Sequence, residues 1–450
     1  FVHYYVSYIA LAMLLILLFY IATRTDVIKI ARVVLPSFII LNLAPLLDLI
    51  ISQGKGYKMT YMLPGVHDNL ILRFFTFFGD FTGQGITPGQ RIEIALVLLG
   101  SLIYFYIKNS NLIKSLFYTL LTYTLLFILA ALPIILNKVL GLTNMEYMNL
   151  LLTQLFLLII FVTGIILSYL INRDRIKIFF DDIRPWRLLH FELMFALGLI
   201  LGMDASLRIF NITDLFNLML IAISIAFAWL YALVSNNIHD YEIDKISNKE
   251  RPLIKPKIGY KDYKRTEKIF PLLALFYAVF VNFQTLFFIL LSIGTAFLYS
   301  VPPLRLKRIP FFSKLFISLG SLLLVMLGFT FVAGTVHGFP NIILAILLIG
   351  FTAAMNFIDI KDYEGDKKAG IKTVPVLLGL KKAKLFTGLF FILTYSSFYF
   401  IAKDLLIPAI LLGVVQFYLI NRKDYNEKHV FLVYSFSLLV LLFYFLLLNQ

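Results

Sequence analysis

The chain has 450 residues, of which 60% are hydrophobic and only 14% are charged, and its formal net charge is +15. Soluble globular proteins average about 45–50% apolar and about 25% charged residues, so this composition excludes a soluble protein and indicates an integral membrane protein. The chain contains no cysteine, which excludes disulfides, thiolate catalysis and thiolate metal sites. The positive charge does not indicate a nucleic-acid partner, because the basic residues fall in loops between hydrophobic runs.

Apolar runs of about 20 residues recur along the whole chain, and this is the length that an α-helix needs to cross a bilayer. The alternation typical of a β-barrel is not seen in the sequence, so we predict an all-α, multi-pass membrane protein. About fourteen spans are predicted, at residues 4–23, 31–51, 92–107, 115–137, 148–171, 187–205, 216–235, 269–283, 285–299, 312–333, 341–358, 383–402, 404–420 and 429–448. The first residue is Phe rather than Met, which indicates that a short N-terminal piece is missing, and no cleavable signal peptide is predicted.

The predicted spans form two blocks. Residues 1–175 are an N-terminal transmembrane region of unknown function, and the second block begins at Arg184. In the second block the cations gather in three alternate loops, at 236–268, 299–314 and 359–384. By the positive-inside rule these loops face the cytoplasm, so we expect a multi-pass protein of the cell membrane with its polar motifs on the cytoplasmic side.

Two acidic stretches stand at the ends of apolar spans, and ionisable residues at such places are functional candidates because each costs a few kcal/mol to insert. In the first stretch Asn236, Asp240 and Asp244 are spaced i, i+4, i+8, so they share one face of a helix that continues the span by a turn or two. Asn237 points elsewhere. The second stretch repeats the spacing with Asp362 and Asp366, and Asp359 lies on the same face, three residues before Asp362.

Carboxylates at i, i+4 repel one another, and burial makes the repulsion worse. A divalent cation resolves both problems, and oxygen-only ligands favour Mg²⁺ or Mn²⁺ over zinc. Mg²⁺ completes its coordination with water and substrate phosphate, and neighbouring cations neutralise the remaining charge of a diphosphate. The sequence therefore predicts that the two stretches hold Mg²⁺ against a diphosphate. In the competing interpretation the acidic groups only form ion pairs with the basic loops and end the helices.

Between the acidic stretches lies Tyr299-Ser-Val-Pro302-Pro303-Leu-Arg305-Leu-Lys307-Arg308. The two prolines end the helix and force an extended exit. Tyr299 is left at the helix end, where its ring can meet a cation; by itself, an interfacial aromatic anchor is the simpler interpretation.

Together these motifs resemble the UbiA family of intramembrane prenyltransferases, over about residues 184–450. That family has nine transmembrane helices, a first motif N-D-x-x-D-x-x-x-D and a second motif D-x-x-x-D. The resemblance implies a nine-helix UbiA-type bundle preceded by about five extra transmembrane helices. The sequence departs from the family at Asn237, where Asp is usual. Because this residue lies about 100° from the predicted ligand row, we expect metal binding to survive.

The resemblance also implies a reaction. An isoprenyl chain would pass from an isoprenyl diphosphate donor to a lipophilic acceptor within the membrane, by ionisation to an allylic carbocation. The implied Mg²⁺ ligands are Asn236, Asp240, Asp362 and Asp366. The implied diphosphate ligands are Arg251, Arg305 and Lys307. Tyr299 would shield the carbocation, and Asp244 and Asp359 would have supporting or acceptor-side roles in catalysis.

The acceptor stays open between geranylgeranylglyceryl phosphate and an aromatic quinone precursor. The motifs look most like the branch with digeranylgeranylglyceryl phosphate synthase, homogentisate prenyltransferases and chlorophyll synthase. The alternative function is a non-catalytic lipid-binding or transport protein on a degenerate fold of this type. Charges gathered at one membrane face favour the enzyme, because transporters place their polar sites near the midplane.

The first block has two interpretations. Its helices either brace the second block or form an acceptor-delivery or second catalytic module, and bracing is the simpler. Asp48, Arg73 and Asp80 are candidates for lining a lipid cavity there.

Overall fold

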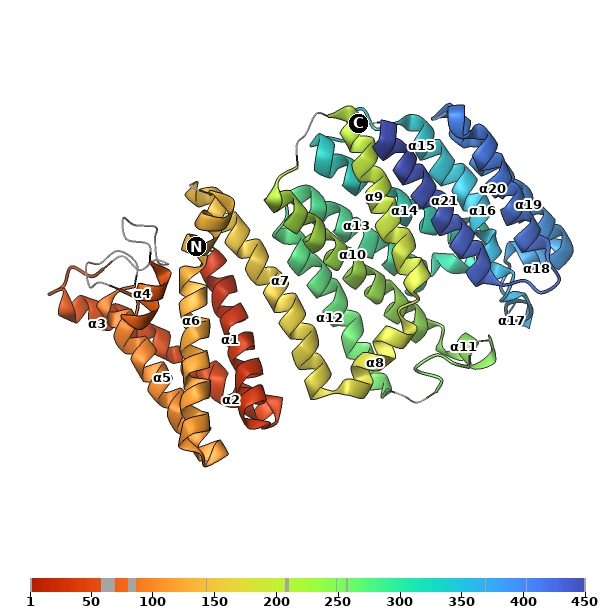
Figure 1. The fold of residues 1–450 in the computed structure, drawn as a ribbon. Helices are drawn as coiled ribbons and strands as arrows, with labels where there is room; N and C mark the ends of the chain where they lie inside the picture. Colours follow the sequence, from red (N-terminus) through yellow and green to blue (C-terminus); the bar gives the residue numbers. More distant parts are fainter. Residues whose placement is uncertain are drawn as a thin grey trace. The chain divides into compact units, whose positions relative to one another are not determined.

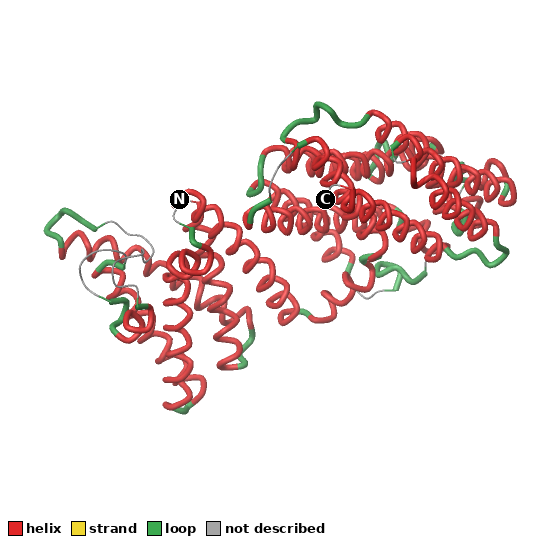
Figure 2. The backbone as a smooth tube through the Cα atoms, turned by 45° about the horizontal axis from the view of Figure 1, so that its top comes forward, coloured by secondary structure: helices red, strands yellow, loops and turns green. Residues whose placement is uncertain are grey.

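A computed structural model of the chain describes residues 2–57, 69–79, 86–142, 144–206, 210–247, 249–255, 258–368, 370–401 and 403–448. Every regular element in these ranges is a helix, and no strand occurs in them (Figure 2). The predicted all-α class is therefore confirmed. The chain divides into two compact units, residues 1–176 and 177–450, and each is described by itself.

The described residues of the first unit form seven α-helices and one short 3₁₀ segment. Their bounds are α1 Val2–Thr23, α2 Val27–Ser37, η1 Phe38–Asn42, α3 Leu43–Ile51, α4 Leu70–Phe75, α5 Pro88–Asn109, α6 Leu112–Leu140 and α7 Met145–Ile171. Helix α1 packs against α7, and α5 packs against both α3 and α6.

The close approach of α3 and α5 explains the burial of Asp48, which is 2% exposed. Its Oδ1 accepts a hydrogen bond from the backbone N–H of Gly89 at 2.7 Å, in the first turn of α5. A Cβ on Gly89 would lie 2.3 Å from the carbonyl oxygen of Ala44, so glycine is required at this contact. Asp48 therefore has a structural partner. Asp80 lies outside the described residues.

Helix α8, Arg173–Asp182, crosses the boundary between the units. The remaining helices of the second unit are α9 Pro185–Ala205, α10 Ile212–His239, α11 Tyr241–Ser247, α12 Tyr260–Val279, α13 Phe283–Ser300, α14 Pro310–Ala333, α15 Asn341–Ala345, α16 Thr352–Ala354, α17 Tyr363–Lys368, α18 Val374–Leu378, α19 Leu380–Ser396, α20 Leu406–Asn421 and α21 Glu427–Leu448. The short segments are η2 Leu306–Arg308, the π-helix η3 Ile346–Phe351, η4 Met355–Asp359, η5 Ser397–Phe400 and η6 Lys403–Leu405.

Helices α9 and α14 form the centre of the second unit, and glycine sets the closeness of their contact. A Cβ on Gly198 would lie 1.9 Å from the carbonyl oxygen of Val325, and one on Gly328 would lie 2.2 Å from that of Phe195. Such backbone contact is typical of membrane helices, where small residues allow close van der Waals packing. The largest cluster of buried apolar side chains surrounds this pair and extends to α21.

Within the described residues, thirteen helical segments are long and apolar enough to cross a membrane: five before residue 172 and eight after residue 184. The fourteen predicted spans exceed this count by α12. That helix has the length of a span, 20 residues, but its first half is charged, so only its second half is apolar. It packs against α10 and α13, and Ser224 donates a buried hydrogen bond to the carbonyl oxygen of Ala274 at 2.6 Å.

Candidate active site

A cavity of about 190 Å³ lies within the second unit, among α9, α10, α13 and α14. Its walls are mainly apolar, and its polar lining includes Arg184, Arg187, Asn236, Tyr299 and Ser300. Asn236 belongs to the first acidic motif and Tyr299 ends α13, so two residues singled out from the sequence meet at this cavity.

The first motif is helical, as its spacing predicts. Backbone hydrogen bonds run from Asp240 N–H to Asn236 O at 2.9 Å and from Asp244 N–H to Asp240 O at 2.8 Å, across the junction of α10 and α11. Asn236 and Asp240 also face a common partner, because Lys307 Nζ donates to Asn236 Oδ1 at 3.0 Å and to Asp240 Oδ2 at 2.6 Å.

The loop that follows the two prolines supplies both cations that face Asp240. Arg305 Nη2 donates to Asp240 Oδ1 at 2.8 Å and also to the carbonyl oxygen of His239. Arg305 adopts a left-handed backbone, with φ of +44°, which costs a non-glycine residue about 1–2 kcal/mol. The ion pair and hydrogen bonds of its side chain offset this cost. Lys307 Nζ also lies 6.0 Å from the ring centroid of Tyr299.

Asn237 points away from the row and is only 1% exposed, as predicted. Its amide nitrogen donates to Asp182 Oδ2 at 2.6 Å and to the hydroxyl of Tyr263 at 2.8 Å. Its amide oxygen accepts from Arg184 Nη2 at 3.1 Å. Burial raises the pKa of Asp182, although the Arg251 guanidinium and the Asn237 amide oppose the shift.

The second motif also has helical spacing, with Asp366 N–H bonded to Asp362 O at 2.8 Å and Asp362 N–H to Asp359 O at 3.1 Å. Asp359 forms an ion pair with Lys314 Nζ at 2.5 Å. Burial raises the pKa of Asp362. Burial, followed by the charges of Asp359 and Asp362, raises the pKa of Asp366 to about 7. For both carboxylates, burial and the acidic neighbours therefore outweigh the nearby cations Lys361 and Lys314.

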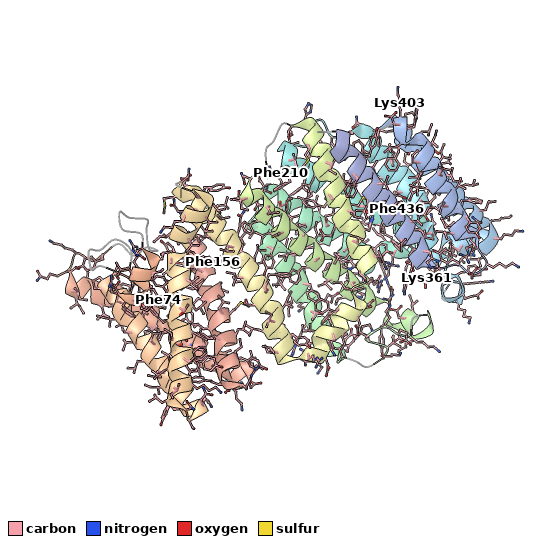
Figure 3. The ribbon with its side chains drawn as sticks, viewed as in Figure 1. Phe74, Phe156, Phe210, Lys361, Lys403 and Phe436 are labelled. Carbon is pink, nitrogen blue, oxygen red and sulfur yellow. The ribbon has the colours of Figure 1, made fainter. Side chains whose placement is uncertain are left out.

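The two motifs lie at the same end of the second unit. Helix α11, which carries Asp244, packs against α17, which carries Asp366 (Figure 1). Figure 3 shows Lys361, beside the second motif, at the opposite end of the helices from Lys403. Among the described residues, no three or more Asp, Glu or His side chains form a group that could hold a metal ion, and the cavity lining includes neither Asp362 nor Asp366.

The three candidate diphosphate ligands do not all lie at Asp240. Arg305 and Lys307 lie at Asp240, whereas Arg251 lies behind the row, with Nη1 3.4 Å from Asp182 Oδ1 and Nε 3.8 Å from Asp244 Oδ2.

Several charged residues at this end were not singled out from the sequence as site residues. Lys314 is 3% exposed and neutralises Asp359. Glu427 pairs with Arg187 at 2.6 Å and also with Lys361. Their chain positions, at the beginnings of the apolar spans α9, α14 and α21, were the available signal. Such charges are also expected at any membrane boundary, so they did not distinguish a site.

A family model described as the UbiA prenyltransferase family matches residues 194–447. Digeranylgeranylglyceryl phosphate synthase of Thermococcus gammatolerans is 29% identical over 208 residues, which are 43% of this chain and 70% of that protein. The enzyme of the same name from Sulfolobus acidocaldarius is 29% identical over 215 residues, covering 46% of this chain and 75% of that protein. A solved structure of a UbiA homolog from Archaeoglobus fulgidus bound to DMAPP and Mg²⁺ aligns with 60% of this chain and 97% of its own, with 20% identity and a TM-score of 0.49.

Proposed function

Because the chain belongs to the UbiA prenyltransferase family, we propose that its second unit carries the transferase site and that the two acidic motifs form it. The protein is a multi-pass membrane prenyltransferase that moves an isoprenyl chain from an isoprenyl diphosphate to a lipophilic acceptor. One observation supports this site assignment most strongly. The helices that carry the ends of the two motifs, α11 and α17, pack against each other, and Asn236 of the first motif lines a cavity with mainly apolar walls.

The motif residues fit a magnesium cofactor. Mg²⁺ typically takes one or two carboxylates from a protein and keeps water and substrate phosphate as its other ligands, so no cluster of three acidic side chains is required. Burial raises the pKa values of Asp362 and Asp366, and their acidic neighbours raise them further, so a bound cation would stabilise both carboxylates as ions. Asn236 and Asp240 would hold one ion, and Asp362 and Asp366 another. Bound Mg²⁺ would neutralise the negative charge that develops on the departing diphosphate.

The two cations that pair with Asp240, Arg305 and Lys307, would be the diphosphate ligands. Lys307 and Arg305 hold Asp240 at close range, so both side chains would lie within reach of a diphosphate bound beside that carboxylate. Tyr299 lines the cavity near Lys307, where its ring face would shield an allylic cation from water. Asp244 and Asp359 would act through Arg251 and Lys314, the cations that they contact.

We propose geranylgeranylglyceryl phosphate as the acceptor, because both relatives named above are digeranylgeranylglyceryl phosphate synthases. An aromatic quinone precursor is the second candidate. The site would lie on the cytoplasmic side of the cell membrane, since its motifs fall in or beside the basic loops 236–268, 299–314 and 359–384.

The test is an assay of the purified protein with labelled geranylgeranyl or farnesyl diphosphate, Mg²⁺ and each candidate acceptor. We expect transfer with wild type, loss of transfer with Asp240→Ala and with Asp362→Ala, and no reaction in excess EDTA. The proposal fails if wild type releases no pyrophosphate with any acceptor from a host lipid extract. It also fails if both variants match wild type. A non-catalytic lipid-binding protein would bind the donor without releasing pyrophosphate.

A further inference from the structure

Asp182 joins four parts of the second unit through one carboxylate. It is the last residue of α8 and precedes the residues that the family model matches. Its Oδ2 accepts from the Asn237 amide of α10 at 2.6 Å and from the Tyr263 hydroxyl of α12 at 3.5 Å. Its Oδ1 accepts from Arg251, in the loop after α11, at 3.4 Å.

This polar cluster is largely buried. Asn237 is 1% and Tyr263 0% exposed, and the side chain of Asp182 is 10% exposed. Apolar packing surrounds it: Phe179 of α8 stacks on the Tyr263 ring with centroids 5.7 Å apart. The α8–α9 junction is tied to α10 by Trp229, whose Nε1 donates to the carbonyl oxygen of Ile183 at 2.7 Å. Hydrogen bonds to a carboxylate in such surroundings are strong, and leaving one partner unmade is costly.

The cluster fixes the orientation of the first motif. Neighbouring residues on a helix point about 100° apart, so anchoring Asn237 against α8 and α12 determines where Asn236 points. Asn236 lines the cavity and shares Lys307 with Asp240. Through Arg251, whose Nε lies 3.8 Å from Asp244 Oδ2, the same carboxylate also holds the loop after α11 against the row.

We propose that Asp182 is a positioning residue for prenyl transfer, which holds Asn237 and Arg251 so that Asn236 and Asp240 face the cavity. The proposal rests on the proposed function. Asp182 touches neither the cavity nor the predicted Mg²⁺ ligands. Partners that orient metal ligands typically contribute about 10–100-fold to activity or metal affinity.

The test compares Asp182→Asn, Asn237→Asp and the double variant in the full-length protein. Asp182→Asn removes the charge at constant shape, and we expect a kcat about 10–100-fold lower and a higher Mg²⁺ concentration for half-maximal rate. Asn237→Asp alone places a second carboxylate at hydrogen-bonding distance from that of Asp182, and the repulsion between them is expected to lower kcat as well. The double variant exchanges amide and carboxylate across the same contact, and we expect it to recover most of the loss.

The matched control is Asp181→Asn. Asp181 is exposed, and no hydrogen bond or ion pair of it is found among the described residues, so wild-type kcat and Mg²⁺ dependence are expected. Amide hydrogen exchange of residues 249–255 supplies a readout that needs no activity, because release of Arg251 should speed exchange there in Asp182→Asn but not in Asp181→Asn.

The outcomes separate the two claims. If Asp182→Asn keeps wild-type exchange and wild-type kcat, or if the double variant stays as impaired as Asp182→Asn, the role of Asp182 is overturned. If exchange rises as expected while wild type releases no pyrophosphate, Asp182 holds the loop as inferred and the proposed function fails instead.

Discussion

At the level of single residues, the two acidic motifs differ in how their charge is compensated. Asp240 lies between Arg305 and Lys307, whereas the pKa of Asp366 is raised to about 7 by burial and by its acidic neighbours. Neighbouring cations favour the ionised form of a carboxylate, whereas burial and neighbouring carboxylates disfavour it. The protein therefore supplies the counter-charge of the first motif, and the second motif has the greater need of a metal ion.

Lys307 provides the sharpest test of this arrangement. In Lys307→Met the cation shared by Asn236 and Asp240 is lost at similar side-chain length, and we expect the KM for the isoprenyl diphosphate to rise about 10–100-fold. A hydrogen bond to a charged group contributes about 1.5–3 kcal/mol, which corresponds to that range. Steady-state kinetics at saturating Mg²⁺ measure it.

Lys245→Met is the control for this substitution. Lys245 lies on the adjacent α11, is exposed, and pairs with Glu242 on its own helix, so its loss should leave KM unchanged. An unchanged KM in Lys307→Met would contradict a role for Lys307 at the diphosphate.

Spacing predicted the helical faces of the first motif better than the partners of its side chains. The i, i+4 rule placed Asn236, Asp240 and Asp244 on one face and turned Asn237 away, because helix geometry is local. It could not find Asp182, since the contact with Asn237 joins positions 55 residues apart and depends on how α8 folds back. A lone Asp at a helix end has no periodic signal.

At the level of helices, hydrophobic length predicted nearly every span, because crossing the bilayer requires about 20 apolar residues. It predicted one span more than the thirteen apolar helical segments of the described residues, at α12, whose first half is charged and which packs against α10 and α13. It also gave no sign of the π-helical turn at Ile346–Phe351, since composition does not record a change in hydrogen-bond register.

Because α9 packs closely on α14, we expect alanine substitutions at two glycines to differ in their effect on thermal stability. Gly198→Ala places a methyl group 1.9 Å from the carbonyl oxygen of Val325, so the helices must separate, and overpacking of this kind typically costs about 1–3 kcal/mol. Gly294→Ala, on α13, meets no atom within 4 Å and gains helix propensity. Thermal unfolding of the detergent-purified proteins should show a lower midpoint for Gly198→Ala only. Equal midpoints would contradict the contact.

At the level of the whole molecule, the absence of cysteine makes the predicted orientation easy to measure. Lys368→Cys, beside the second motif, and Lys403→Cys, at the opposite end of the second unit, each add one thiol to a chain that has none, and both positions are exposed. In intact cells a membrane-impermeant maleimide should label Lys403→Cys, and should label Lys368→Cys only after the cells are opened. The reverse pattern would place the acidic motifs outside the cell.

The division into two units gives a final prediction about where the chemistry lies. A chain that starts at Asn172 lacks the five spans of the first unit but keeps α8, whereas one that starts at Pro185 also lacks Asp182. Both begin on the predicted cytoplasmic side, so the basic loops should still orient the remaining helices. If the first unit only braces the second, the longer chain keeps its kcat per folded molecule, and the shorter chain loses about 10–100-fold because Asn237 and Arg251 lose their carboxylate partner.

Both chains are compared with the full protein at equal amounts in the membrane, with the maleimide assay as the check on orientation. If the longer chain still releases pyrophosphate with acceptor added in detergent, but not with acceptor presented in vesicles, the first unit delivers the acceptor. Loss of activity under both conditions would contradict bracing and place part of the chemistry before residue 172. Equal activity of the two truncated chains would remove α8 from the catalytic arrangement, because near the first motif they differ in Asp182 and its helix and in Ile183 and Arg184, which contact Trp229 and Asn237.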